Sequence, residues 1–347
     1  VGGMGVLVFL LAVVPVSGRN DGFTMHLLRA ESPGPNVAKL VPRIRSTAGI
    51  LYILYIVLTV VDFLFLLAGK MPVLEAVCTA FGTAGTGGFG VKNDSMASYS
   101  PYIQNVCTVF MLLFGVNFSC YYLLIMKQVK SVYKDEELRL YVGMVLGSVL
   151  LIVINLRGFY GTFEETVRHA FFQVASIVTT TGFATTDFDL WPGFSKSILL
   201  CLMVVGACAG STGGGFKCGR LLLVFKSLRR NIQKMLRPQR IQAVRSNKQV
   251  VSEKVLENTN AYLAAYVLII MFSLLVTSID GFSVGTNFSA VLACFNNIGP
   301  GLELVGPTCN FSIYSPLAKI VLIFDMLAGR LEIFPILILL SRDTWRR

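Results

Sequence analysis

The sequence predicts an all-α membrane protein made of repeated units that surround a central ion pore, and two observations predict it. Of the 347 residues, 54% are hydrophobic and 14% are charged. The mean hydropathy of +0.68 lies far above that of a soluble domain of this size. In addition, one unusual unit occurs three times: a long apolar run, a short apolar run that stops at a Thr/Gly-rich or Asn/Gly-rich stretch, and another long apolar run.

The short apolar runs predict half-helices that enter a membrane without crossing it. They span Met71–Thr83, Phe163–Val178 and Val284–Asn297. At about 1.5 Å per residue, none of them crosses a hydrocarbon layer of about 30 Å. Irregular backbone at membrane depth is tolerated only where it is buried in protein or lines a watery cavity. We therefore expect three hairpins around one pore axis, each a half-helix followed by an extended return strand.

The other elements follow in order along the chain. Spanning helices are expected at Val1–Ser17, Thr47–Leu67, Pro101–Lys127, Glu137–Leu156, Phe194–Phe225, Asn260–Ile279 and Ser315–Leu340. Because the first of these would close a unit, we expect four units in a pseudo-fourfold arrangement, with most of the first unit missing. The expected division is 1–45 for the last helix of that unit and a cytoplasmic loop, 46–135 for the second unit, 136–225 for the third unit with its broken second helix, 226–257 for a basic, helical cytoplasmic linker, and 258–347 for the fourth unit.

The net charge of +11 is compatible with nucleic-acid binding, but its distribution indicates a membrane protein. Lys and Arg gather in alternate loops, at residues 19–45, 127–139, 226–254 and 342–347. The positive-inside rule makes these loops cytoplasmic, so all three hairpins open from the outside. We expect a multi-pass protein of the cell membrane, with the linker near anionic lipid head groups and no nucleic acid as a partner.

The eight cysteines include no CxxC pair, and the two histidines have no ligand-like spacing. Cysteines inside apolar runs are typical of packing rather than of metal binding or disulfides. No His/Asp/Glu or Ser/Lys constellation occurs at membrane depth, so the sequence does not favour an enzyme.

The three stops have the residues that an ion filter needs. A half-helix directs the negative end of its dipole at a cation, and the carbonyls of the return strand can replace the hydration shell of the ion. Glycine admits the positive φ that such a strand requires, and no stop has an acidic residue before its glycine, which favours a monovalent cation. The alternative is that these glycines serve only turns. The expected filter residues are Thr86, Gly87, Gly88 and Phe89; Thr180, Thr181, Gly182 and Phe183; and Asn297, Ile298, Gly299 and Pro300.

Residues beside the stops are expected to support them. Phe89, Phe183 and Pro300 directly follow the glycines and are buried-type side chains that could wedge each loop from behind. Asp94, Asp187 and Asp189 follow the stops and are expected to concentrate cations at the mouth of the pore.

A break is predicted in the middle of the second helix of the third unit. Its residues are Gly210, Ser211, Thr212, Gly213, Gly214 and Gly215. Each glycine costs about 1 kcal/mol relative to alanine in a helix, and a phosphate-binding loop is excluded because it would need a Gly-Lys-Ser/Thr ending. A face for close helix packing is the alternative.

Arg330 is a charge inside the last apolar run, where such residues face a cavity or a partner. The alternative to a cavity is a pairing with Asp62 or with another buried carboxylate.

These residues resemble the Trk/Ktr/HKT superfamily of potassium uptake proteins, and most closely the bacterial Trk-type membrane subunits. The resemblance rests on the three stops and on Gly2–Gly5, Arg29–Pro35, Ala209–Gly215 and Gly329–Phe334. It implies four units around one pore, with Gly88, Gly182 and Gly299 as filter glycines and K⁺ as the transported ion at their carbonyls. It also implies that Gly210–Gly215 is a gate below the filter and that Arg330 is an electrostatic barrier in the pore.

The resemblance further implies a homodimer whose cytosolic partner is a ring of nucleotide-binding regulatory subunits. The nucleotide belongs to that partner, and no covalently bound cofactor is expected in this chain. Two alternatives stay open at this point: an alternating-access symporter coupled to sodium or protons, and a sodium-permeable relative. Alternating access usually goes with inverted repeats, whereas these units share one orientation.

Overall fold

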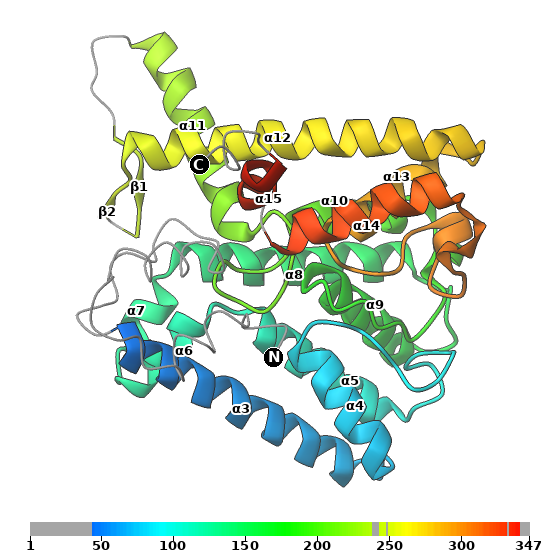
Figure 1. Ribbon diagram of the computed structural model, residues 1–347. Helices are drawn as coiled ribbons and strands as arrows, with labels where there is room; N and C mark the ends of the chain where they lie inside the picture. Colours follow the sequence, from blue (N-terminus) through cyan, green and yellow to red (C-terminus); the bar gives the residue numbers. More distant parts are fainter. Residues whose placement is uncertain (1–43, 238–242, 248, 332, 341–347) are drawn as a thin grey trace.

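The computed structural model describes residues 44–237, 243–247, 249–331 and 333–340. The expected helix Val1–Ser17 and nearly all of the loop after it lie outside these residues. The described part is helical apart from one short hairpin and the loops, as the sequence predicts (Figure 1).

Three units of the expected kind follow one another. The second unit holds α3 (Ile44–Ala68), α4 (Val73–Ala84), α5 (Pro101–Gly115), α6 (Phe118–Ile125) and α7 (Val129–Tyr133). The third unit holds α8 (Glu136–Asn155), α9 (Phe163–Val178), η2 (Phe188–Leu190), α10 (Gly193–Val205) and α11 (Cys218–Leu236). The fourth unit holds α12 (Glu253–Thr277), η3 (Ser278–Asp280), α13 (Val284–Phe295), η4 (Glu303–Val305), η5 (Phe311–Ile313), α14 (Pro316–Arg330) and α15 (Ile333–Leu340).

The predicted half-helices are confirmed as α4, α9 and α13, of 12, 16 and 12 residues. They begin where the sequence provides a start signal. Proline precedes α4, and the side chains of Thr162 and Ser283 cap α9 and α13. All three lie in the half of the molecule away from the short β-hairpin at residues 245–250 (Figure 1). None is as long as the 18 residues that a spanning helix needs.

The first helix of each unit is continuous, whereas the second helix of each unit is broken. Within the described residues, three helices are long and apolar enough to span a membrane: Gly49–Ala68, Glu136–Asn155 and Glu253–Asp280. The break between α10 and α11 was expected. The expected single helices Pro101–Lys127 and Ser315–Leu340 are wrong, because each consists of two helices, and α5 and α6 differ in direction by 88°.

The break between α5 and α6 has a clear physical cause. The last carbonyls of α5 accept hydrogen bonds from elsewhere: Phe114 O from the Thr212 N–H (3.4 Å) and Gly115 O from the Cys208 N–H (3.1 Å). A Cβ at Gly115 would lie 2.5 Å from the Tyr141 hydroxyl. Asn117 then starts α6 by accepting from the Ser119 N–H. Two broken helices therefore satisfy each other's backbone groups at membrane depth.

The linker 226–257 was expected to be helical, and this is wrong in its middle. Helix α11 continues to Leu236, and Arg237 has φ −140° because it precedes a proline. Strands β1 (Arg245–Ser246) and β2 (Gln249–Val250) then form an antiparallel hairpin, which pairs Arg245 with Val250. Helix α12 begins after it.

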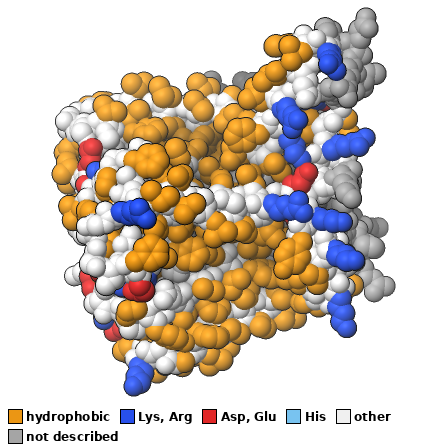
Figure 2. Space-filling view, turned by 180° about the vertical axis from the view of Figure 1, so that it is seen from behind, with side chains coloured by type: hydrophobic (Ala, Val, Ile, Leu, Met, Phe, Trp, Pro, Cys, Tyr) orange, Lys and Arg blue, Asp and Glu red, His pale blue; other side chains and the backbone are white. Residues whose placement is uncertain are grey.

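The surface agrees with a membrane protein of the predicted orientation. Apolar side chains cover most of the face shown in Figure 2, while Lys and Arg side chains gather along one end of it. On α3, for example, Ile53, Val60 and Leu64 are exposed. Outward-facing aliphatic side chains of this kind suit lipid rather than water.

Candidate ion pathway

The three stops have one backbone conformation although their sequences differ. The first residue after each helix cap has a positive φ: 49° at Thr86, 57° at Thr180 and 56° at Asn297. Two residues later a glycine has a positive φ again: 64° at Gly88, 87° at Gly182 and 107° at Gly299. The predicted register of the three stops is therefore correct. The equivalent return strands are residues 86–92, 180–186 and 297–303.

The hydrogen bonds at the three stops repeat in the same way. The residue between the two positive-φ positions donates its N–H back into the half-helix: Gly87 to Gly82 O (2.8 Å), Thr181 to Ser176 O (2.9 Å) and Ile298 to Ala293 O (2.8 Å). The residue before it donates its N–H to the following carbonyl of the helix: Thr86 to Thr83 O, Thr180 to Ile177 O and Asn297 to Cys294 O. This pattern is the Schellman motif, which satisfies the last carbonyls of a helix. It turns the chain sharply from half-helix into return strand.

The three return strands lie one against the next. A Cβ added at Gly88 would overlap the Thr181 carbonyl oxygen, and a Cβ added at Gly182 would overlap the Ile298 carbonyl oxygen. At Gly299 nothing in the described residues lies within 4 Å of such a Cβ. The structure thus brings the predicted stops together in chain order and leaves the position beside Gly299 open.

The residues expected as wedges behind the loops differ in burial. Phe183 is 0% exposed, and its ring packs against Gly82 of α4. Phe89 is 83% exposed, as the strand of the second unit has no described neighbour on that side. Pro300 is partly buried.

The glycine-rich break forms an intramembrane loop, residues 206–217, against the inner ends of all three half-helices. The Thr212 carbonyl accepts from the Thr86 hydroxyl (3.0 Å), and the Gly214 N–H donates to the Thr180 hydroxyl (2.6 Å). A Cβ at Gly214 would lie 2.6 Å from Asn296 O. Only glycine allows this approach, so the loop closely covers the end of the hairpins opposite to their mouth.

Helices α6 and α8 and a lysine of the loop itself hold the intramembrane loop in place. Its Gly210 carbonyl accepts from the Phe118 N–H (3.1 Å), and its Ala209 N–H donates to Glu137 of α8 (2.6 Å). The buried Lys217 side chain donates to Gly213 O within the loop. Glu137 was missed at the sequence level, where it is one of three consecutive acidic residues at the start of a helix.

Arg330 contacts the intramembrane loop. Its guanidinium donates to the Thr212 carbonyl (3.3 Å), the same oxygen that accepts from Thr86. The alternative pairing of Arg330 with Asp62 is wrong, because Asp62 is fully buried and neither of its carboxylate oxygens has a hydrogen-bond partner among the described residues.

The expected mouth carboxylates differ from one another in their surroundings. Asp94 is exposed, whereas Asp189 accepts from the Glu303 N–H (3.0 Å) and lies 3.4 Å from the Lys196 ammonium. Glu303 was missed, since nothing in its local pattern marks it. Hydrogen bonds from the Ser283 and Thr286 hydroxyls hold the pKa of Glu303 below its usual value. Glu303 is therefore a negative charge at the point where the outer loops of the third and fourth units meet.

Comparisons with known proteins show similar sequences and a similar fold. The family model described as TrkH, cation transport protein, matches residues 1–156 and 161–345. The Trk system potassium uptake protein TrkH of Salmonella typhimurium is 37% identical, over 99% of this chain and 71% of that protein. The TrkH of Escherichia coli is 36% identical over the same shares. The crystal structure of the potassium transporter TrkH from Vibrio parahaemolyticus has a TM-score of 0.84 and 31% identity, and the match covers 99% of this chain and 70% of that one.

Proposed function

The chain belongs to the TrkH family of cation transport proteins, and from that membership we propose that it takes up potassium across the cell membrane through a carbonyl-lined selectivity filter. The observation that supports the filter most directly is the contact between successive return strands at Gly88 and Gly182. Backbone carbonyls from several strands around one axis can replace the hydration shell of K⁺. Such a site needs no resident cofactor.

The filter residues are those of the three stops. Thr86–Phe89, Thr180–Phe183 and Asn297–Pro300 present backbone carbonyls, and the inner ends of α4, α9 and α13 add their negative dipole ends beneath them. A fourth return strand beside Gly299 completes the ring. The open space at that position in the described residues supports this step.

Permeation is controlled on the inner side by the intramembrane loop, with Gly210–Gly215 at its centre, and by Arg330. The loop's contacts with Thr86 and Thr180 support this role, because a loop in that place blocks the axis until it moves. Arg330 adds a positive charge next to the same oxygen of Thr212. A cation entering this region meets both a steric and an electrostatic barrier.

The protein works as a homodimer with a cytosolic ring of nucleotide-binding regulatory subunits. The basic end of the molecule, including α11 and the hairpin, is the docking side for that ring and for anionic lipids (Figure 2). Sodium- or proton-coupled alternating access is the second candidate. It is disfavoured because α4, α9 and α13 share one orientation (Figure 1), whereas that mechanism usually uses inverted repeats.

Rubidium tracer uptake by the intact protein in liposomes tests the function, with sodium as competitor. We expect uptake that prefers rubidium and potassium over sodium and does not saturate at millimolar ion. Gly182→Ala should lose this preference, because its Cβ overlaps Ile298 O and φ is +87°. Gly147→Ala in α8 is the matched control, since nothing lies within 4 Å of its Cβ. Saturating flux would favour the symporter, and unchanged preference in Gly182→Ala would contradict the filter.

A further inference from the structure

The return strand of the third unit, residues 180–186, is hydrogen-bonded directly after its glycine, at Phe183, whereas the other two described return strands are not. Side chains on one face of α9 hydrogen-bond to it just beyond Gly182. We propose that His169, Gln173 and Ser176 are positioning residues which fix this strand and thereby set the discrimination between K⁺ and Na⁺. The proposal rests on the function proposed above and deepens it.

The three side chains follow the helical repeat and reach Phe183 and Thr185 of the strand. The Ser176 hydroxyl donates to the Phe183 carbonyl (2.6 Å). Thr185 Oγ1 lies 2.9 Å from His169 Nδ1 and accepts a longer bond of 3.5 Å from Gln173 Nε2. Residues three and four apart lie on one side of a helix. All three side chains are buried, and His169, the outermost, is only 8% exposed.

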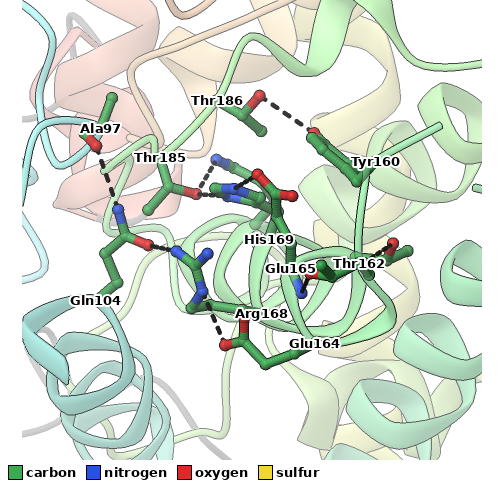
Figure 3. Close-up of polar contacts among 12 residues, drawn as sticks. Ala97, Gln104, Tyr160, Thr162, Glu164, Glu165, Arg168, His169, Thr185 and Thr186 are labelled. Atoms are coloured by element: carbon green, nitrogen blue, oxygen red, sulfur yellow. Dashed lines mark hydrogen bonds and ion pairs between the residues drawn. The ribbon is translucent and has the colours of Figure 1, made fainter. Parts of the chain in front are cut away.

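Further side chains brace the outer end of the same strand (Figure 3). The Tyr160 hydroxyl lies 3.1 Å from Thr186 Oγ1, and the ring of Tyr160 stacks on His169 with centroids 5.0 Å apart. Trp191 donates to the Tyr160 hydroxyl in turn (2.9 Å). The hydroxyl groups of Thr185 and Thr186 are thus both fixed by aromatic or imidazole side chains, which have few rotamers to lose.

The strand is also tied to the second unit. The Ala184 carbonyl accepts from the Met96 N–H (2.9 Å), and the Ala184 N–H donates to the Ser95 hydroxyl (3.2 Å). In Figure 3, Arg168 of α9 reaches Gln104 of α5. The amide of Gln104 donates to carbonyls of the same outer loop, including Met96 O (3.0 Å). Each residue from Phe183 to Thr186 therefore has a partner outside the strand.

The other units have different side chains at the equivalent positions. The positions of His169, Gln173 and Ser176 correspond to Glu75, Thr79 and Gly82 in the second unit and to Thr286, Ala290 and Ala293 in the fourth. Among the described residues, no hydrogen bond reaches Phe89, Gly90 or Val91. In the fourth unit the first such bonds are at Gly301 and Leu302, where Leu302 N–H donates to Ser289 (2.9 Å). Of the three described return strands, only the third is fixed directly after its glycine.

The consequence for the ion follows from the size of the site. A return strand that is free to move can close around a smaller ion, whereas a fixed strand keeps its carbonyls at the spacing that suits the larger one. Na⁺ then has to give up hydration without full compensation. Losing one of these hydrogen bonds should lower the preference for K⁺ over Na⁺ by on the order of tenfold.

Two matched pairs of variants test this in the intact protein. Ser176→Ala removes the bond to Phe183 O, and Ser195→Ala removes an equally buried serine hydroxyl that bonds Asn155 (2.7 Å) away from the strand. His169→Leu removes the bond to Thr185, and His169→Asn keeps a polar group near the place of Nδ1. Thr185→Val repeats the test from the strand side. Rubidium uptake is measured with and without sodium, together with the membrane level of each variant.

We expect Ser176→Ala, His169→Leu and Thr185→Val to lose discrimination while keeping a comparable maximal flux, and Ser195→Ala and His169→Asn to behave like wild type. If Ser176→Ala and Thr185→Val reach wild-type membrane levels and still discriminate between rubidium and sodium as well as the wild type does, the proposal is overturned. Equal loss in Ser195→Ala would overturn it as well, because the effect would then be general destabilisation. If the wild-type protein itself fails to prefer rubidium over sodium, it is the proposed function that fails.

Discussion

Single residues decide how closely the backbone segments of this protein approach one another. Thr86, Thr180 and Asn297 each have a positive φ, and the side chain of each hydrogen-bonds to the broken second helix of a unit. Thr86 donates to Thr212 O, Thr180 accepts from the Gly214 N–H, and Asn297 donates to Met326 O. Such strain persists where the surroundings fix it, and it clusters at functional sites. The stops and the breaks therefore form one interlocked structure.

Arg330 gives the prediction at this scale. Two unit charges about 6 Å apart at an effective dielectric constant of 20 repel by about 3 kcal/mol, which corresponds to roughly a hundredfold in ion occupancy. Arg330→Gln should therefore raise rubidium flux in the absence of any cytosolic partner, and Arg330→Lys should retain most of the barrier. Liposome flux checks both. Equal flux in all three proteins would contradict the proposed role of Arg330.

At the scale of elements, the start of α8 links the β1–β2 hairpin to the intramembrane loop. Asp135 and Glu136 hydrogen-bond to Asn247 of the hairpin, and Glu136 also pairs with Lys226 of α11. The next residue, Glu137, holds the Ala209 N–H of the loop. Movement of the hairpin or of α11 thus acts on the helix end that anchors the loop.

Glu137→Ala is the prediction for this element. A hydrogen bond to a charged group contributes about 1.5–3 kcal/mol, so its loss should loosen the loop and raise basal flux roughly tenfold. Glu136→Ala is the control, since Glu136 hydrogen-bonds to Asn247 and pairs with Lys226 of α11, whereas Glu137 makes the bond to the loop. Flux measured without a cytosolic partner distinguishes the two. Similar flux in Glu137→Ala and wild type would show that the loop does not depend on this anchor.

At the scale of the whole molecule, the basic end and the hairpin mouths lie at opposite sides of an apolar surface (Figures 1 and 2). The half-helices of all three units enter from the same side. The positive-inside rule makes that side external. The exposed Cys309 lies on the external side of this arrangement, in the loop before α14.

Labelling with a membrane-impermeant maleimide checks this orientation. Intact cells should label Cys309, and Cys309→Ser should abolish the signal. In a Cys309→Ser background, Ser246→Cys in the hairpin should react only after the cells are permeabilised. Labelling of the hairpin from outside would reverse the topology and with it the roles of filter and gate.

The sequence by itself determined the membrane class, the three half-helices, the register of the stops and the break at Gly210–Gly215. These features are local: run length, glycine content and charge depend only on neighbours along the chain. It also marked Arg330 as exceptional without naming its partner.

Only the tertiary structure decided which segments meet. The breaks after Gly115 and Arg330 were not predicted. The end of α5 hydrogen-bonds to the loop at 206–217, and a Cβ at Gly329 would overlap the Phe295 carbonyl oxygen, so both places involve segments that are distant in the sequence. The sequence also did not show that Phe89 is exposed, that Glu137 anchors the loop, or which side chains hold Phe183–Thr186. Each depends on which other segment of the chain lies beside it, and helical spacing within one segment carries no information about that neighbour.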